Sequence, residues 1–547
     1  MKKLLSALIS GLMVLSLTAC GSSSSTAAAA SGAASSTGSA TAQSFDTIIE
    51  ATKTASNIDP LNMNQSGKNF LWEVYEMLFD LDGFGGDMYG VLADSSKGEY
   101  KGYDHEAGTP EYTVYLYQNI KDSAGNAITA SDVVFSYNTM KDSGYAHGWN
   151  TLASVDAVDD YTVKFTFTRE LTKVGELSAY WARCFVFSQK AYEASASKFA
   201  SDAVGTGPYV LKSYTAGSGI TLEKNPNYWQ TDTTAIHTQH QANIENIQYK
   251  FIDEDATNVV GLQTGDVDIV EEVATKSITD FQDGGAYADT YDVYQHANNL
   301  TDMALANVSS DSVCNDINMR LALFYAIDPV GVVNYMDTNS VKSVYALGNA
   351  NFPDYDSGWE KEDNYETLSS DARAAKVKEY LDKAGYNGQK IKILCLNEEH
   401  YKNLSQVVGS MLNAAGIQTA DVQAVDNSTY QTLLADSTDW DLDVCGWAAN
   451  DFIVNCWDHI FSVGSTGKTG TFIDQNDQLI TLLNTARETA THTQENVDAV
   501  HEYYISQAYG MGLCQSIVNV VYNSKKITKL VFTDKSMILP GACTYTN

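Results

Sequence analysis

Two short patterns contain residue types that could bind a phosphate or a metal ion. The segment Ser462–Thr469 is close to the phosphate-binding loop pattern, but a serine stands at its first glycine position and no clear strand precedes it. His237 and His240 could face the same way on a helix, yet no cysteine or third histidine lies near them. We interpret the segment as a loop and the histidines as surface residues, and we expect no metal ion and no other cofactor.

Signatures of catalysis are missing from the sequence. It contains no Gly-x-Ser-x-Gly and no His-Glu-x-x-His pattern. Its 68 Asp and Glu residues make carboxylate pairs so frequent that none can be singled out as a general acid and base. We therefore expect a binding protein that is not an enzyme.

The overall charge limits the partners of the chain. The formal net charge of −34 repels phosphate backbones and anionic lipid headgroups, so we expect no nucleic-acid partner. The eight cysteines form no Cys-x-x-Cys pair. One of them is assigned to a lipid below, and for the other seven we expect mostly buried thiols with at most one or two disulfides.

The first twenty residues predict export. Lys2 and Lys3 precede an apolar segment, Leu4–Leu17, that is too short to span a membrane. The segment ends in Leu17-Thr18-Ala19-Cys20, which resembles the bacterial lipobox, where the cysteine is lipidated and becomes the first mature residue. We predict a lipoprotein signal peptide over residues 1–20 and a palmitate-type acyl anchor on Cys20, at the extracytoplasmic face of the membrane.

Residues 21–44 are rich in Ser, Ala, Thr and Gly and lack apolar periodicity. This composition predicts a flexible tether between the anchor and the folded part. The remaining chain is long enough for about three domains of ordinary size.

Strand and helix patterns alternate in the second half of the chain. The predicted elements are a helix over 372–384 that stops at Gly385, a strand over 391–396, a helix over 404–415, a strand over 420–425, a short helix from Asn427 or Ser428, and a strand over 442–447. Strands separated by helices predict parallel pairing in an α/β domain. Earlier in the chain, residues 112–117 and 161–168 alternate β-prone side chains and predict antiparallel strands.

Seven groups of residues follow one another in a recognisable order. They are Asn57–Leu61 with a helical Phe70–Asp80, Ala130–Ser136 with the strand pair Val155–Phe167, Gly205–Tyr209, Asn225–Trp229, Gln263–Asp268, Arg320–Asp328, and Asp441–Trp447. In this order the chain resembles the family 5 solute-binding proteins of ATP-binding cassette importers. The most specific groups, Gly205–Tyr209 and Asn225–Trp229, have ordinary structural roles as turns and core packing, so they indicate a fold without indicating a ligand.

The resemblance implies an α/β fold of the periplasmic-binding-protein type, with two lobes, an inserted subdomain and a ligand cleft between the lobes. The first lobe would comprise residues 45–90, 203–295 and 516–547, with 91–202 as the inserted subdomain, and the second lobe residues 296–515. The chain would cross between the lobes near Ala297–Asp302 and Gln515–Asn519, and these crossings would act as hinges.

Two segments are implied to contact the ligand. One is Asn64, Gln65, Ser66 and Gly67, and the other comprises Trp447, Ala448, Asn450 and Asp451 at the end of a strand. Peptide binders of the family have an aspartate three residues after this tryptophan, which pairs with the α-ammonium of the peptide. Here that position is Asn450, so either Asp451 takes the role or the ligand differs. Trp447 either contacts the ligand or belongs to the core.

The function that follows is a receptor that delivers a ligand to the permease subunits of an importer. An oligopeptide is the expected ligand, with an oligosaccharide or a metal complex as alternatives, and we expect a monomer. Two other classes remain open: a lipid-anchored hydrolase, and a sensor or adhesin on the same fold. Turnover of an offered substrate would favour the hydrolase.

Overall fold

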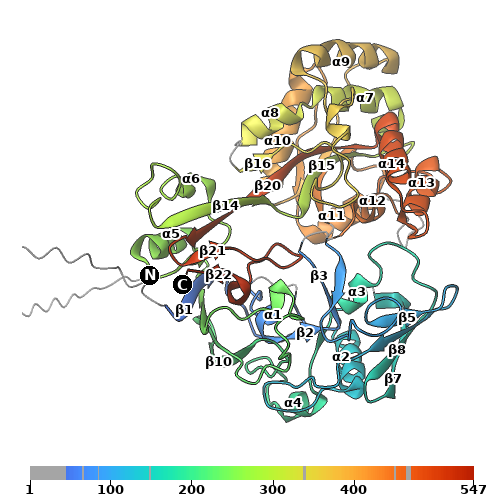
Figure 1. The fold of residues 1–547 in the computed structure, drawn as a ribbon. Coiled ribbons are helices and arrows are strands. Elements are labelled where there is room, and N and C mark those ends of the chain that lie inside the picture. Colours follow the sequence, from blue (N-terminus) through green and yellow to red (C-terminus); the bar gives the residue numbers. More distant parts are fainter. Residues whose placement is uncertain are drawn as a thin grey trace, which may run out of the picture. The chain divides into compact units, whose positions relative to one another are not determined.

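One long strand, β20 (Gly510–Asn523), joins the two halves of the main sheet (Figure 1). The computed structural model describes residues 45–63, 67–83, 86–146, 149–336, 340–448, 451–462 and 470–546. The described residues from Phe45 onward belong to one unit. The predicted signal peptide, Cys20 and the tether lie outside the described residues. So do Asn64, Gln65, Ser66 and Asn450 of the predicted site and residues 463–469 of the loop examined as a phosphate site.

The partners of β20 change along its length. Its first half pairs with β15 (Leu300–Ala306) and β16 (Val341–Lys342), and its second half pairs with β14 (Tyr291–Ala297) and β13 (Ile269–Val270). The change falls between Cys514, which pairs with Asp302, and Ile517, which pairs with Ala297. This change of partners lies in the two segments that the resemblance implies as crossings, and their action as hinges stays a prediction.

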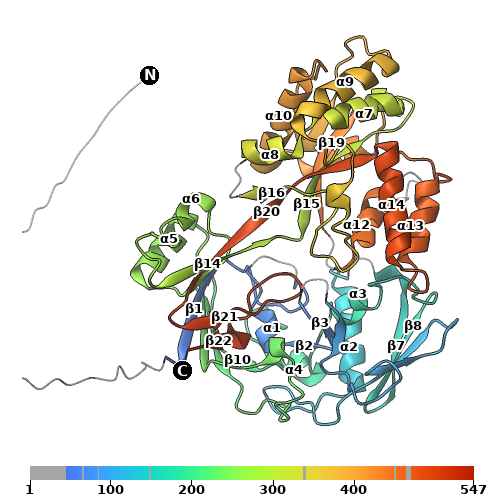
Figure 2. The same ribbon diagram turned by 45° about the horizontal axis from the view of Figure 1, so that its top comes forward.

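Two apolar cores lie on either side of this crossing (Figure 2). The core that includes Ile48, Trp72 and Ile247 defines what we call the first lobe. The core that includes Leu323, Leu404 and Val444 defines the second lobe. The domain boundaries inferred from the resemblance stay a prediction.

The sheet of the first lobe combines antiparallel and parallel pairs. Its strands, in spatial order, are β10 (Tyr209–Thr215), β11 (Gly219–Lys224), β12 (Asn246–Phe251), β1 (Thr47–Thr52) and β13. β1 pairs in parallel with both β12 and β13, so the carboxyl ends of these three strands meet at one edge. Helix α5 (Asp255–Thr264) connects β12 to β13 and ends at Gly265, whose φ of 76° suits a left-handed helix stop.

The second lobe contains the predicted α/β succession. The elements are α9 (Ser370–Ala384), β17 (Ile393–Leu396), α10 (Glu399–Ala414), β18 (Gln423–Val425), α11 (Asn427–Leu434) and β19 (Leu442–Ala448). β17 pairs in parallel with β18 and with β19, which confirms the predicted parallel arrangement. α9 ends at Gly385 with a φ of 62°, as the sequence predicted.

A small antiparallel sheet contributes buried side chains to the first-lobe core. It consists of β5 (Tyr103–His105), β6 (Glu111–Tyr115), β8 (Thr162–Phe167) and β7 (Leu152–Asp159). Helix α2 (Ala130–Asp142) packs on it and begins with a capping box between Thr129 and Asp132. The predicted antiparallel strands are confirmed.

Further described elements complete the two lobes. In the first lobe they are β4 (Met88–Gly90), η1 (Trp149–Thr151), α3 (Ser178–Trp181), β9 (Phe185–Val186), α4 (Gln189–Ala194), η2 (Thr238–His240), α6 (Thr275–Ile278), β21 (Ile527–Lys529), η5 (Pro540–Ala542) and β22 (Thr544–Tyr545). In the second lobe they are η3 (Val313–Asn315), α7 (Ile317–Ala326), α8 (Pro329–Met336), η4 (Trp359–Lys361), α12 (Ile453–Phe461), α13 (Gln478–Arg487) and α14 (Gln494–Gln507).

The predicted helix over Phe70–Asp80 is wrong. Only α1 (Leu71–Val74) is helical, and the chain then extends through β2 (Glu76–Met77) and β3 (Phe79–Leu81). All of these residues are buried, so their apolar pattern carries no helical periodicity that could distinguish the two conformations. Gly205 lies close to the end of this helix, since a Cβ there would lie 2.0 Å from the carbonyl oxygen of Val74, and Gly207 N donates a hydrogen bond to that oxygen at 2.9 Å.

The interpretation of His240 as a surface residue is wrong. Its side chain is buried, not on the surface, and Nε2 lies 3.1 Å from Tyr89 Oη and 3.6 Å from Asp80. His237 is half-buried and stacks on the Tyr89 ring at 3.8 Å. These contacts make the pair part of the first-lobe packing. Within the described residues, no group of three or more His, Cys, Asp and Glu side chains could hold a metal ion.

The motif residues Tyr228 and Trp229 pack in the first lobe, as expected from their sequence context. Tyr228 Oη and Trp229 Nε1 both donate hydrogen bonds to the buried carboxylate of Glu76, at 2.5 and 2.7 Å. The seven cysteines after Cys20 are all buried free thiols, and burial raises the pKa of each. No helix among the described residues is long and apolar enough to cross a membrane.

Candidate ligand-binding cavity

A cavity of about 400 Å³ lies between residues of the first and second lobes. The first lobe and the small sheet region contribute Met63, Met140, Tyr145, Trp149, Val174, Gly175, Glu176, Ser178, Ala179, Arg183 and Lys535. The second lobe contributes Ala448, Asp451, Asn455, His459 and Arg487. The volume falls in the range of small-ligand pockets.

The structure brings two of the predicted site residues into this cavity. Ala448 and Asp451 line its second-lobe wall, directly after β19. Trp447 is half-buried, and its ring lies 6.0 Å from that of His459, which also lines the cavity. Gly67 is found elsewhere, in a smaller pocket of the first lobe.

Asp451 is held in place by its own neighbours. Its Oδ1 accepts hydrogen bonds from Phe452 N at 2.7 Å and from Asn455 Nδ2 at 3.0 Å. Its Oδ2 lies against Gly175 of the opposite wall, where a Cβ would come within 1.9 Å of it. The carboxylate is therefore oriented toward the cavity before any ligand binds.

The start of α12 does not depend on Asp451. The buried Asp354 accepts hydrogen bonds from Ile453 N and Val454 N at 2.7 and 3.3 Å. Burial raises the pKa of Asp354 to about 6. Because another carboxylate satisfies these first backbone donors, Asp451 is available to a ligand.

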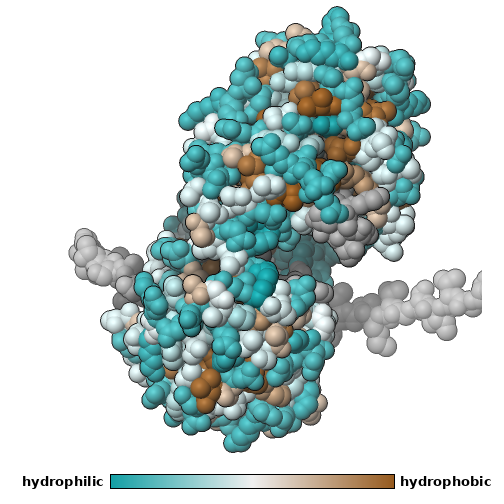
Figure 3. Space-filling view, turned by 90° about the vertical axis from the view of Figure 1, so that its right-hand side faces the viewer, coloured by the Kyte–Doolittle hydropathy of each residue, from teal (hydrophilic) through white to brown (hydrophobic). Residues whose placement is uncertain are grey.

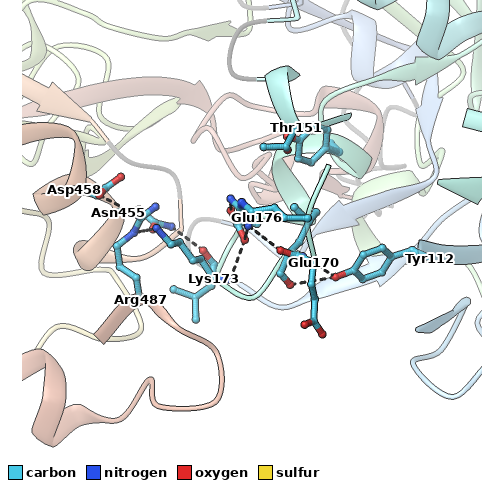
Figure 4. Close-up of polar contacts among 12 residues, drawn as sticks. Tyr112, Thr151, Glu170, Lys173, Glu176, Asn455, Asp458 and Arg487 are labelled. Carbon is cyan, nitrogen blue, oxygen red and sulfur yellow. Dashed lines mark hydrogen bonds and ion pairs between the residues drawn. The ribbon is translucent and has the colours of Figure 1, made fainter. Parts of the chain in front are cut away.

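Figure 4 shows Asn455, Asp458 and Arg487 next to the segment that carries Lys173 and Glu176. The two walls also touch each other through the main chain. Val174 N donates to Arg487 O at 2.9 Å, and Thr489 N donates to Thr172 O at 2.6 Å. Asn455 Nδ2 donates to Val174 O at 3.1 Å. Val174 is itself part of the second-lobe core. We call this set of contacts the rim contact, and it connects the lobes in addition to the strand crossings.

Two cationic side chains of the first lobe, which no sequence motif predicts as site residues, line the cavity. Arg183 forms a 2.5 Å ion pair with the fully buried Asp534. Lys535 lies 5.4 Å from the centre of the Trp72 ring. Burial, together with the nearby Arg183 charge, lowers the pKa of Lys535 to about 8. The one feature of the local sequence that could have indicated Arg183 is its position as a single charged residue within the apolar segment Tyr180–Val186.

The charges of the cavity suit a ligand with both an anionic and a cationic group. Asp451 comes from the second lobe, while Arg183 and Lys535 come from the first. Charge-assisted hydrogen bonds are about twice as strong as neutral ones, so such groups select ligands by charge. On the face seen in Figure 3, hydrophilic residues predominate and hydrophobic ones are scattered.

A second cavity of about 380 Å³ lies beside β14. Tyr294, His296 and Phe532 line it, and the Tyr294 and Phe532 ring centres are 5.2 Å apart. Asn351 of the second lobe also contributes to its wall. Aromatic surface is thus available next to the strand crossing.

Comparison with known families and proteins identifies relatives over most of the chain. The family described as bacterial extracellular solute-binding proteins, family 5 middle, matches residues 88–455. The chain is 23% identical over 465 residues to the probable D,D-dipeptide-binding periplasmic protein DdpA of Escherichia coli strain K12, covering 80% of this chain and 83% of that protein. It is 24% identical over 377 residues to the periplasmic oligopeptide-binding protein OppA of Salmonella typhimurium, covering 62% of this chain and 64% of OppA.

Solved structures share the fold at low sequence identity. The unliganded open form of MppA, a periplasmic murein tripeptide-binding protein, superposes with a TM-score of 0.75 at 16% identity, covering 91% of this chain and 97% of that one. HbpA2 of Haemophilus parasuis gives a TM-score of 0.77 at 17% identity, covering 92% and 100%. The fold expected from the sequence, a two-lobed α/β periplasmic-binding-protein type, is confirmed.

Proposed function

This chain belongs to the bacterial extracellular solute-binding proteins of family 5, and from this membership we propose that it captures a short peptide and delivers it to an ATP-binding cassette importer. Relatives named for dipeptide and oligopeptide binding support the ligand class. A structural neighbour named as an ABC transporter substrate-binding protein supports the importer. The receptor itself performs no chemical step.

The observation that carries the peptide assignment is the charge pattern of the cavity between the lobes. A short peptide carries an α-ammonium and an α-carboxylate. Asp451 is the acceptor proposed for the ammonium, and Arg183 and Lys535 are the donors proposed for the carboxylate. A neutral oligosaccharide has no charged groups and could not form these charge-assisted hydrogen bonds.

Asp451 is preferred over Asn450 as the anchor. Its carboxylate lines the cavity and is oriented by Phe452 N and Asn455. Trp447 is proposed to contribute apolar contact near His459. The loop Asn64–Gly67 stays a proposed contact on the first lobe.

We further propose that the mature protein is a monomer held on the outer face of the membrane by lipidated Cys20. A tether of 24 residues at residues 21–44 would let the binding lobes move over a permease. A Cys20→Ala protein is expected to lose metabolic palmitate labelling and membrane retention. Normal labelling of that variant would contradict the anchor.

Capture would stabilise the closed arrangement of the lobes. Only when the lobes approach can Asp451 and the two first-lobe cations contact one ligand at the same time. The rim contact between Val174 and Arg487 would form in this state and break when the ligand enters or leaves.

The test is to identify what the protein carries. Mature protein is purified in detergent, its ligand is released by acid, and the released molecules are identified by mass spectrometry. Short peptides with free amino termini are expected, and calorimetry should show that they rebind unchanged. Recovery of oligosaccharides instead, or hydrolysis of an offered peptide, would overturn the proposal.

A further inference from the structure

A smaller pocket of about 120 Å³ lies in the first lobe, separate from the cavity described above. Its walls include the last residues of β1, the residues after β12 and β13, and the start of α5. These are the carboxyl ends of three parallel strands, the edge at which open α/β sheets bind ligands. We call it the acidic pocket.

The acidic pocket is lined by acceptor groups. Glu271 and Glu272 follow β13 and form part of its wall. Asn69 and Asn258 also line it and are only 5% and 7% exposed. Among the described residues, the side-chain oxygens of both asparagines have no hydrogen-bond partner.

The donors of the two asparagines are already used. Asn69 Nδ2 donates to Glu50 Oε1 at 2.6 Å, and Asn258 Nδ2 donates to Ile252 O at 3.4 Å. Glu50 is 1% exposed, and within the described part of the chain its Oε2 also has no partner. The open hydrogen-bonding capacity here is therefore that of acceptors, and it calls for a donor with positive charge.

The nearest lysine does not meet this demand. Lys53 lines the pocket, but its ammonium donates to Asp253 O at 2.9 Å and to Asp255 Oδ1 at 3.3 Å. Burial raises the pKa of Glu271 to about 7 and that of Glu50 well above its ordinary value. The pocket thus disfavours negative charge that no cation compensates.

The pocket lies next to the strand crossing. Val273 N donates to Asn519 O of β20 at 2.9 Å, and Asn519 Nδ2 donates back to Val273 O at 2.9 Å. Thr275 Oγ1 accepts a hydrogen bond from Ser340 Oγ of the second lobe at 2.8 Å. The segment that carries Glu271 and Glu272 therefore continues directly into contacts between the lobes.

We propose that the acidic pocket binds a cationic end group of the captured solute, a primary ammonium or a guanidinium. The described residues offer no three-ligand metal group, and the small volume suits the end of a side chain better than a whole peptide. On a peptide whose amino terminus pairs with Asp451, this group is a lysine or arginine side chain. The peptide form of the inference rests on the proposed function.

The experiment compares matched peptides on full-length mature protein in detergent. Calorimetry measures Ala-Lys-Ala against Ala-norleucine-Ala, each with a free and an acetylated amino terminus. Norleucine keeps the lysine stem and removes the ammonium. Wild-type protein should prefer the lysine peptide by about tenfold to a hundredfold with either form of the amino terminus, because the terminus is assigned to Asp451 and not to the acidic pocket.

Variants of the acidic pocket test whether this pocket causes the preference for a cationic group. Glu271→Gln/Glu272→Gln should abolish it while leaving the affinity for the uncharged peptide unchanged, since glutamine can still accept the hydrogen bond that Ile538 N donates to Glu271 at 2.6 Å. Glu272→Gln alone, at an exposed position, should reduce it if the double variant does not fold. Glu193→Gln, on exposed α4, is the matched control and should behave as wild type.

A second probe separates this inference from the proposed function. Cadaverine and agmatine are titrated alone, with thermal stabilisation as the readout. One outcome is that no peptide binds but these amines stabilise wild type and not the double variant. This outcome would support the acidic pocket as a cation site and contradict the proposed function as a peptide receptor. If peptides bind without any cationic preference, or if neither peptides nor amines bind, the acidic pocket assignment is overturned.

Discussion

Gly175 and Asp451 face each other across the cavity so closely that a side chain at position 175 would displace the Asp451 carboxylate. A Cβ there would lie 1.9 Å from Asp451 Oδ2 and 2.9 Å from Asn455 Nδ2. Gly175 comes from the first lobe and Asp451 from the second. This contact depends on the approach of the lobes, so it offers a way to test closure.

Gly175→Ala should hold the lobes apart. The added methyl group would meet Asp451 Oδ2, so either the carboxylate or the facing lobe must move. We expect the rim contact to weaken and the ligand to bind less tightly. Small-angle scattering of the ligand-saturated variant should show a larger radius of gyration than liganded wild type.

The control for this prediction is Gly217→Ala. Gly217 has a φ of 70°, close to the 75° of Gly175, but no atom lies within 4 Å of its Cβ position. It carries the same backbone cost without the contact. If both variants close normally around ligand, the Gly175 contact does not report on closure.

Asp451→Asn should weaken the binding of peptides with a free amino terminus by about tenfold to a hundredfold, because it removes a charged hydrogen bond of ~1.5–3 kcal/mol. Acetylating the peptide should weaken binding to wild type to a similar extent and should add little in the variant. Calorimetry measures both. Asp371→Asn on the exposed part of α9 is the control. If neither Asp451→Asn nor acetylation of the peptide changes the affinity, Asp451 does not bind the α-ammonium.

Lys535 predicts a pH dependence of peptide binding. Its pKa is lowered to about 8, so the ammonium is charged below this pH and neutral above it. Affinity for a ligand carboxylate should therefore fall as the pH rises through about 8, and somewhat above it when bound carboxylate stabilises the charge. Arg183, Asp534 and Asp80 are the charged neighbours that also act on this lysine.

Measured by calorimetry with an amino-acetylated peptide, whose terminus does not titrate between pH 7 and pH 9, Lys535→Met should flatten the pH profile. Lys525→Met, at an exposed position, should leave it unchanged. A wild-type affinity that stays constant across this range would show that Lys535 does not bind the ligand.

Glu366 predicts how stability changes with pH. Its buried carboxylate accepts a hydrogen bond from Gly512 N of β20 at 2.8 Å, and burial raises its pKa to about 8. Between the unfolded pKa near 4.3 and this value, the folded state binds more protons than the unfolded state. Stability due to this group is therefore full at low pH and is lost as the pH rises, by up to about 1.4 kcal/mol per pH unit.

Glu366→Gln should remove this component. Glutamine keeps the acceptor for Gly512 N and cannot ionise, so the variant should gain stability relative to wild type as the pH rises from 5 to 8. Urea unfolding at several pH values measures the difference. A difference that does not change with pH would mean that Glu366 ionises normally in the folded protein.

Much of the second lobe could be predicted from the sequence alone. The amphipathic patterns of α9 and α10, the glycine stop at 385 and the short apolar strand β17 have local causes, and the parallel pairing follows from their alternation. The ordered motifs likewise indicated the family that residues 88–455 match. These features depend on residues that are near one another in the chain.

What only the tertiary structure decided depends on residues that are far apart in the chain. The segment after Val74 extends beside Gly205 and Gly207, which are distant in the sequence, and no local pattern indicates this contact. Arg183 and Lys535 are separated by more than three hundred positions yet line one cavity with Asp451. Charge complementarity to a ligand depends on residues that are distant in the chain and close in the fold. Helix and strand formation depends on backbone geometry and periodic burial. For that reason the family could be predicted from the sequence, while the charges that would select a ligand became visible in the fold.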